Sequence, residues 1–192
     1  MIEIIDNFLT KADYQKIYET GRDPEFPWYY ISKASFDSEH VAPENSIETS
    51  AFIHVLLRKD RMEKSTYITN YLPLLDKIEK DFNVDLIRVR LGMKHRQIGF
   101  TENNYNLPHT DFRFPHISMI YYVNESDGDT WLFNEFRHPN DADYPKEFTV
   151  QQRVSPKPNR LLVFDGLQHH TASNPVNSNE RTIININGVK RY

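Results

Sequence analysis

The sequence predicts one domain that consists mostly of β-strands, with helices packed outside one sheet, as in a β-sandwich or barrel. Short segments rich in β-branched and aromatic residues recur through the later part of the chain, and turn-forming residues separate them. Helical periodicity is confined to about the first 83 residues. The length of 192 residues suits a single domain. We therefore expect a helical N-terminal part over about residues 1–83 and a β core over about residues 84–190.

The N-terminal part is expected to begin with a short strand at residues 2–5, where isoleucine recurs. Thr10 and Asp13 form a capping box that starts a helix, and Gly21 ends it. The next segment, residues 22–45, contains three prolines and is expected to be a loop with a short strand.

Residues 51–57 are apolar enough for a strand or a helix, and residues 65–82 carry apolar side chains at the three- and four-residue spacing of a helix. Pro73 lies inside this second segment. A proline removes a helical hydrogen bond, so it should either kink the helix or mark the start of a second one.

From residue 85 the period changes to two. Ile87, Val89 and Leu91 alternate with Arg88 and Arg90, which predicts a strand with one buried and one polar face. Five further strands are expected, at residues 117–123, 130–136, 148–153, 160–164 and 182–187. Between two of them, residues 127–130 read as a hairpin turn, because the remaining ligands of a calcium loop are missing.

Composition excludes several classes of function. Charged residues make up 26% of the chain and the net charge is −4, which argues against general electrostatic binding of nucleic acid. There is no cysteine, so disulfides and thiolate metal sites are excluded. The sequence shows neither a secretion signal nor an apolar stretch long enough to span a membrane, and we expect a cytoplasmic protein.

The segment around His109 and Asp111 is the strongest candidate for a functional site. Side chains two positions apart on an extended segment point to the same side, so these two residues can bind one ion. A third ligand from a distant strand would complete a site of two histidines and one carboxylate, which suits Fe(II) that must also bind a cosubstrate and O2. Either His169 or His170 can supply it, but not both, because neighbours on a strand point to opposite faces.

Four motifs occur in order along the chain, at residues 108–111, 119–124, 127–130 and 159–166, and His170 and Arg181 follow them. Their order and content resemble those of the 2-oxoglutarate- and Fe(II)-dependent oxygenases, and most closely their prolyl-4-hydroxylase-like branch. The resemblance implies a double-stranded β-helix, a cupin-like jelly roll, with Fe(II) as metal and with 2-oxoglutarate and O2 as cosubstrates. It also selects His170 as the third ligand, because a histidine follows the Phe164-Asp165-Gly166 motif after three residues.

The resemblance further assigns Arg181, eleven positions after His170, to the far carboxylate of 2-oxoglutarate. A guanidinium can bind that group through two charge-assisted hydrogen bonds. Related proteins carry a serine two positions later, where this chain has Ile183. Tyr121 matches a position from which some prolyl hydroxylases donate a hydroxyl to the same carboxylate. Two short basic clusters, residues 58–61 and 94–96, are typical of solvated loops, and the second could line the entrance to the site.

The predicted function is therefore a dioxygenase that hydroxylates an unidentified substrate, with a peptidyl proline or another amino-acid side chain favoured over a free small molecule. Two alternatives remain open at this point. One is a cupin-like metalloenzyme that does not use 2-oxoglutarate, and the other is a jelly-roll module that binds metal without turnover. Arg181 distinguishes them, because an enzyme without 2-oxoglutarate has no need for a buried cation at that position. Neither a nucleic-acid partner nor a membrane partner is indicated.

Overall fold

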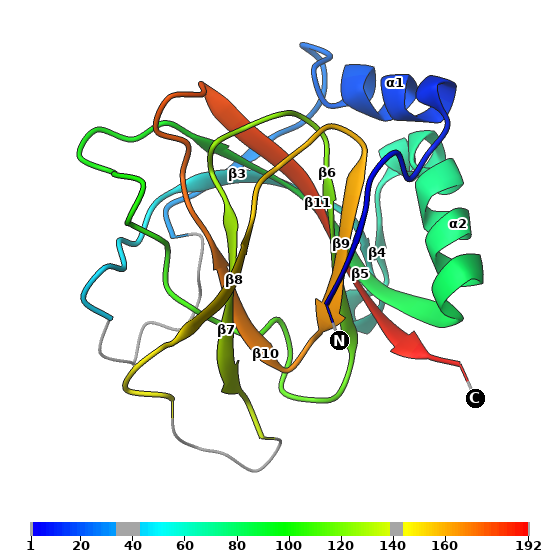
Figure 1. Cartoon of the computed structure of the whole chain (residues 1–192). Coiled ribbons are helices and arrows are strands. Elements are labelled where there is room, and N and C mark those ends of the chain that lie inside the picture. Colours follow the sequence, from blue (N-terminus) through cyan, green and yellow to red (C-terminus); the bar gives the residue numbers. More distant parts are fainter. Residues whose placement is uncertain (1, 34–42, 139–143, 192) are drawn as a thin grey trace.

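Two antiparallel sheets and two outer α-helices form the described part of the computed structural model, residues 2–33, 43–138 and 144–191 (Figure 1). The larger sheet has the strand order β1-β9-β6-β11-β5-β3-β2, with β4 paired to β3, and the smaller has the order β10-β7-β8. The strands are β1 (Ile2–Ile5), β2 (Tyr29–Ile31), β3 (Ala51–Arg58), β4 (Glu63–Lys64), β5 (Val84–His95), β6 (Ile117–Tyr122), β7 (Thr130–Phe136), β8 (Val150–Val154), β9 (Arg160–Asp165), β10 (Gln168–Ala172) and β11 (Glu180–Lys190). Figure 1 shows both helices on one side of the larger sheet, and the smaller sheet on the other side. The predicted fold class is thus confirmed.

The helices begin and end where the sequence signals them. Helix α1 (Lys11–Thr20) starts at Thr10, whose hydroxyl accepts a hydrogen bond from the backbone N–H of Asp13, and it ends at Gly21. Helix α2 (Leu72–Phe82) has its proline in the first turn and follows a separate 3-10 helix over Thr66–Asn70. Pro73 therefore marks the start of a second helix rather than a kink, since a proline in the first turn loses no helical hydrogen bond.

The main hydrophobic core lies between these helices and the outer face of the larger sheet. Leu74 and Ile78 of α2 are fully buried there, together with alternate residues of β5 and β11 such as Leu91 and Ile184. Because side chains alternate along a strand, the intervening residues of β5 and β11 point into the space between the two sheets. A bulge in β5 opposite Asn187 and Gly188 makes Ile87 an extra residue, so it falls outside the predicted alternation.

The first 83 residues contribute β1 to β4 as well as both α-helices, and the strands at residues 2–5 and within residues 22–45 were expected. Two other expectations need correction. Strand β10 was not predicted, because its residues are mostly polar. Residues 127–130 do not form a hairpin, since β6 belongs to the larger sheet and β7 to the smaller one. Of the predicted loop at residues 22–45, positions 34–42 lie outside the described residues.

Neither α-helix in the described ranges combines the length and the hydrophobicity needed to span a bilayer.

Candidate metal centre

His109 and His170 face each other across a short antiparallel bridge at the edge of the smaller sheet that β10 forms. The backbone N–H of each residue donates to the carbonyl oxygen of the other at 3.0 Å. The two imidazole rings lie 4.8 Å apart between centroids. Residues far apart in the sequence are thus held side by side by backbone hydrogen bonds, as the prediction requires.

Asp111 completes a group in which the three ligand atoms, one from each side chain, lie within 4.8 Å of one another. The Nδ1 atom of His109 lies 3.1 Å from the carbonyl oxygen of Leu107, and Nδ1 of His170 lies 3.1 Å from that of Gln168. These contacts place the ring proton on Nδ1 and leave Nε2 with a free lone pair. In His170 that Nε2 atom is buried, has no hydrogen-bond partner, and lies 3.9 Å from Asp111 Oδ2.

The protonation states favour cation binding. Burial lowers the pKa of His109, and it lowers the pKa of His170 to about 3 with a further contribution from His109, so both rings are neutral near pH 7. Burial by itself would raise the pKa of Asp111, but Arg88 and other polar neighbours outweigh it and hold the pKa well below its usual value. Two neutral imidazoles and one carboxylate are the donor set that Fe(II) takes in oxygenases, and the three residues fit that metal.

Asp111 is fixed by side chains from two strands of the larger sheet. Arg88 forms an ion pair with Oδ1. The amides of Asn185 and Asn187 donate to Oδ2 at 3.1 and 2.8 Å. These three residues were not predicted to belong to the site, although Arg88 lies on the face of β5 that was predicted to be polar.

Arg181 is 2% exposed and points between the sheets from β11. Its Nε donates to the carbonyl oxygen of Gly128 at 2.6 Å, and Nη2 donates to the hydroxyl of Thr130 at 2.7 Å. A Cβ atom at position 128 would lie 2.8 Å from the carbonyl oxygen of Ser173 and 3.0 Å from Cδ of Arg181, so glycine is needed for this close approach. The predicted anchor is therefore buried in the same cavity as His109 and His170.

Tyr121 is not brought to Arg181. It lies in the main core on the helix side of β6, and its hydroxyl donates to Asn159 Oδ1 at 2.8 Å. The next residue, Tyr122, points the opposite way and donates its hydroxyl to Thr130 Oγ1 at 2.7 Å, the atom that Arg181 also contacts. Tyr122 rather than Tyr121 therefore lies on the side of β6 that faces Arg181, because successive side chains of a strand point to opposite faces.

His169 points away from the three ligands. Its Nδ1 atom lies 3.1 Å from the carbonyl oxygen of Glu135, and its ring packs edge-on against Tyr144 and Phe148. It is only 2% exposed, so it does not face solvent, and it is not part of the group of three possible metal ligands.

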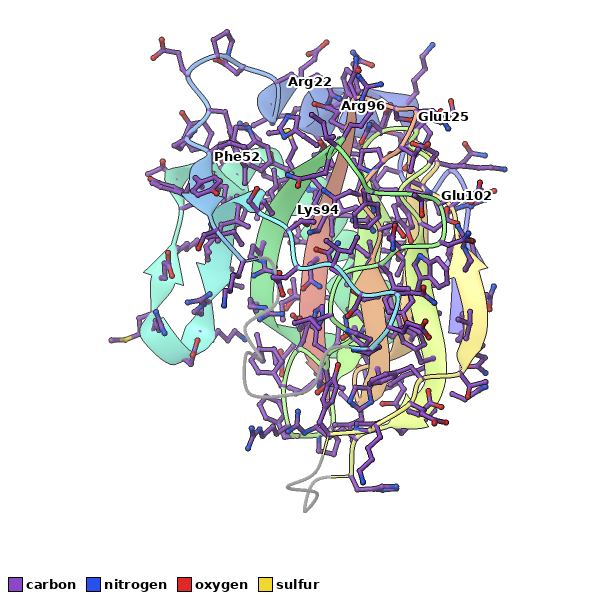
Figure 2. All side chains as sticks on the ribbon, turned by 90° about the vertical axis from the view of Figure 1, so that its left-hand side faces the viewer. Arg22, Phe52, Lys94, Arg96, Glu102 and Glu125 are labelled. Atoms are coloured by element: carbon purple, nitrogen blue, oxygen red, sulfur yellow. The ribbon has the colours of Figure 1, made fainter. Side chains whose placement is uncertain are left out.

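The cavity carries two more cations, Arg90 and Lys94 of β5, in addition to Arg181. Figure 2 shows Lys94 among the side chains in front of β5 and β11, whereas Arg96 lies near the top of the molecule. Lys94 is 8% exposed, so the basic cluster at residues 94–96 is not simply a solvated loop. Ile183, which stands where related proteins have serine, also lines this cavity.

No protein-family model and no curated protein matches this chain. Solved structures do. An oxidoreductase of the 2-oxoglutarate–Fe(II) oxygenase family from Burkholderia pseudomallei aligns with 99% of this chain and 85% of its own, at 10% identity and a TM-score of 0.68. A prolyl hydroxylase from Trichoplax adhaerens, in complex with a peptide fragment of the hypoxia-inducible factor, aligns with 98% of this chain and 83% of its own. The sequence identity is 15% and the TM-score is 0.62.

A third solved structure is the epimerase SnoN in complex with Fe3+, α-ketoglutarate and nogalamycin RO. It aligns with 98% of this chain and 78% of its own, at 10% identity and a TM-score of 0.63. At these identities the similarity establishes the architecture alone. The chain therefore has the double-stranded β-helix fold of the 2-oxoglutarate- and Fe(II)-dependent oxygenases.

Proposed function

We propose that this protein is a 2-oxoglutarate-dependent Fe(II) dioxygenase. One observation carries the proposal: His170 Nε2 is buried without a hydrogen-bond partner and faces Asp111, with His109 beside it. A buried nitrogen without a hydrogen-bond partner costs free energy, and coordination of a metal ion through its lone pair would remove that cost. The buried Arg181 in the same cavity supports a dicarboxylate cosubstrate.

Each of these residues has a distinct task. His109, Asp111 and His170 would hold Fe(II), while Arg88, Asn185 and Asn187 keep the Asp111 carboxylate ionised and fixed in orientation. Arg181 would bind the far carboxylate of 2-oxoglutarate with the N–H groups that Gly128 and Thr130 leave free. Tyr122 orients Thr130 and thereby Arg181. The bound iron, with 2-oxoglutarate and O2, would supply the oxidising chemistry and release succinate and CO2.

For the substrate we propose an amino-acid side chain, a peptidyl proline among the candidates, and hydroxylation as the reaction. The resemblance to the prolyl-4-hydroxylase-like branch supports this choice. The similar solved structures include both a hydroxylase with a peptide and an epimerase with a small molecule, so a free small-molecule substrate is the second candidate.

The test is O2-dependent formation of succinate from 2-oxoglutarate by the purified protein with Fe(II). We expect slow formation without substrate and faster formation with the right substrate. A cupin-like enzyme that does not use 2-oxoglutarate, or a module without turnover, would form none. The His170→Ala protein is the matched control and should be inactive.

A further inference from the structure

The side chain of Arg90 forms no hydrogen bond or ion pair with another described residue, and the Asp111 carboxylate near it is already paired with Arg88. It lines the cavity together with His109 and His170, and its Nε atom is buried without a hydrogen bond. Burial, with Arg88 nearby, lowers the pKa of Arg90 to about 10, so the side chain remains charged at neutral pH. A buried cation without an anion is costly, and such charges usually have a partner or bind a ligand.

Arg90 lies at the metal end of the cavity and Arg181 at the other end. On β5, Arg90 pairs in register with Asn185, the residue whose amide contacts Asp111, whereas Lys94 pairs with Arg181. Four strand positions separate Arg90 from Lys94, a distance of about 13 Å between Cα atoms at about 3.3 Å per residue. The carboxylate bound by Arg181 is therefore not the group that Arg90 would pair with.

The charges near the metal end also leave Arg90 unmatched. Arg88 is already paired with Asp111. One carboxylate of 2-oxoglutarate would bind at Fe(II) and the other at Arg181, so neither is left for Arg90. The charge of Arg90 then remains unmatched at the metal end of the cavity, next to the place where a substrate must approach the metal.

We infer that the substrate carries a carboxylate and that Arg90 binds it, so that the oxidised carbon is held beside the metal. The inference rests on the proposed function and narrows it to amino-acid substrates with a free carboxylate, either on the side chain or at the α-carbon. A guanidinium binds a carboxylate through two parallel hydrogen bonds, which fixes orientation as well as position.

The experiment measures binding of matched acids and amides by calorimetry. Wild-type protein is prepared with Fe(II) and saturating 2-oxoglutarate, without O2, and titrated with three acid–amide pairs. The first pair is N-acetylproline and N-acetylprolinamide. The second is N-acetylaspartate amide and N-acetylasparagine amide, and the third is N-acetylglutamate amide and N-acetylglutamine amide, in which the acid is the side chain. Each pair has nearly the same shape and differs in charge. The same titrations are run on Arg90→Gln, on Arg90→Lys, and on Arg61→Gln as a matched control at an exposed arginine.

We expect at least one acid to bind wild-type protein about 30-fold or more tightly than its amide. Arg90→Gln should abolish this preference, Arg90→Lys should keep part of it, and Arg61→Gln should leave it unchanged. Equal binding of acid and amide by wild-type protein, a comparison that needs no variant, would overturn the inference. So would a preference that survives in Arg90→Gln, or a loss of 2-oxoglutarate binding in Arg90→Gln without any acid preference in wild type. If wild-type protein fails to bind 2-oxoglutarate at all, the proposed function fails first and the inference fails with it.

Discussion

Lys94 and Arg181 lie directly opposite each other on the neighbouring strands β5 and β11, and both side chains are buried. Lys94 Nζ donates to Thr49 Oγ1 at 3.0 Å and to Asn106 Oδ1 at 2.9 Å. Burial lowers the pKa of Lys94 to about 7, with further contributions from Arg181 and Arg90 that outweigh the opposing effect of Glu48. Two buried cationic side chains side by side repel each other, and an anionic ligand bound between them would relieve the repulsion.

The first prediction concerns the pH dependence of stability that Lys94 causes. In the unfolded chain its pKa returns to the ordinary value of 10.5, so between about pH 7 and pH 10 the unfolded state binds one more proton than the folded state. Stability should therefore rise with pH across this range, by up to about 1.4 kcal/mol per pH unit. Lys94→Met should lack this contribution.

The measurement is the free energy of unfolding of both proteins in urea at several pH values from 6 to 9. Lys64→Met, at an exposed position of β4, is the matched control and should follow the wild type. A constant difference between wild type and Lys94→Met over this range would show that Lys94 keeps its ordinary pKa.

The second prediction separates the two adjacent tyrosines. Tyr122→Phe removes a hydrogen bond to Thr130, which orients Arg181, and should weaken 2-oxoglutarate binding about fivefold, corresponding to about 1 kcal/mol. Tyr121→Phe removes the bond to Asn159 in the core and should lower the free energy of unfolding by about 1 kcal/mol, with no effect on 2-oxoglutarate binding. Calorimetric titration and urea unfolding of both variants test this crossed pattern. Weaker 2-oxoglutarate binding in Tyr121→Phe alone would restore the assignment made from the sequence.

The third prediction distinguishes the two adjacent histidines. His170→Ala removes a metal ligand and should sharply weaken Fe(II) binding, as should His109→Ala and Asp111→Ala. His169→Ala should instead retain Fe(II) binding and lose stability, because it removes ring contacts with Tyr144 and Phe148. Anaerobic Fe(II) titration combined with a melting temperature for each variant gives both readouts. Iron lost in His169→Ala and kept in His170→Ala would reverse the assignment.

Much of the fold could be predicted because local patterns and tertiary packing agree. The strand at residues 130–136 coincides with β7, and the capping residues Thr10 and Gly21 bound α1. Strand β10 could not be predicted in the same way. It carries Gln168, His169 and His170, which have no apolar alternation, and it forms a strand because it pairs with β7.

The three metal ligands and Arg181 could be located from spacing and resemblance, whereas the residues that support them could not. Alternation on β5 revealed that Arg88 and Arg90 share a face, but the sequence does not say whether a polar face meets solvent or lines a cavity. This face of β5 lines a cavity because the smaller sheet lies opposite it, and the sequence does not reveal that arrangement. The choice between Tyr121 and Tyr122 likewise depends on which side of β6 the helices cover.

The fourth prediction concerns Arg181. Replacing it by Ala removes the partner of a desolvated carboxylate, which typically costs about 2 to 5 kcal/mol. The affinity for 2-oxoglutarate should therefore fall on the order of 30-fold to several thousand-fold. Arg181→Lys should recover part of the affinity, because the charge is kept while the bidentate geometry is lost. Affinity for Fe(II) without 2-oxoglutarate should change little, and this serves as the internal control.

The most direct test of the proposed function is a titration of 2-oxoglutarate into the anaerobic Fe(II) protein, followed by visible absorption. We predict a saturable charge-transfer band in the wild-type protein. In Arg181→Ala the 2-oxoglutarate concentration that gives half saturation should be higher by about 30-fold to several thousand-fold. Undiminished affinity in Arg181→Ala would contradict the role of that residue. Absence of any band or binding in the wild-type protein, at 2-oxoglutarate concentrations far above the iron concentration, would contradict the proposed function itself.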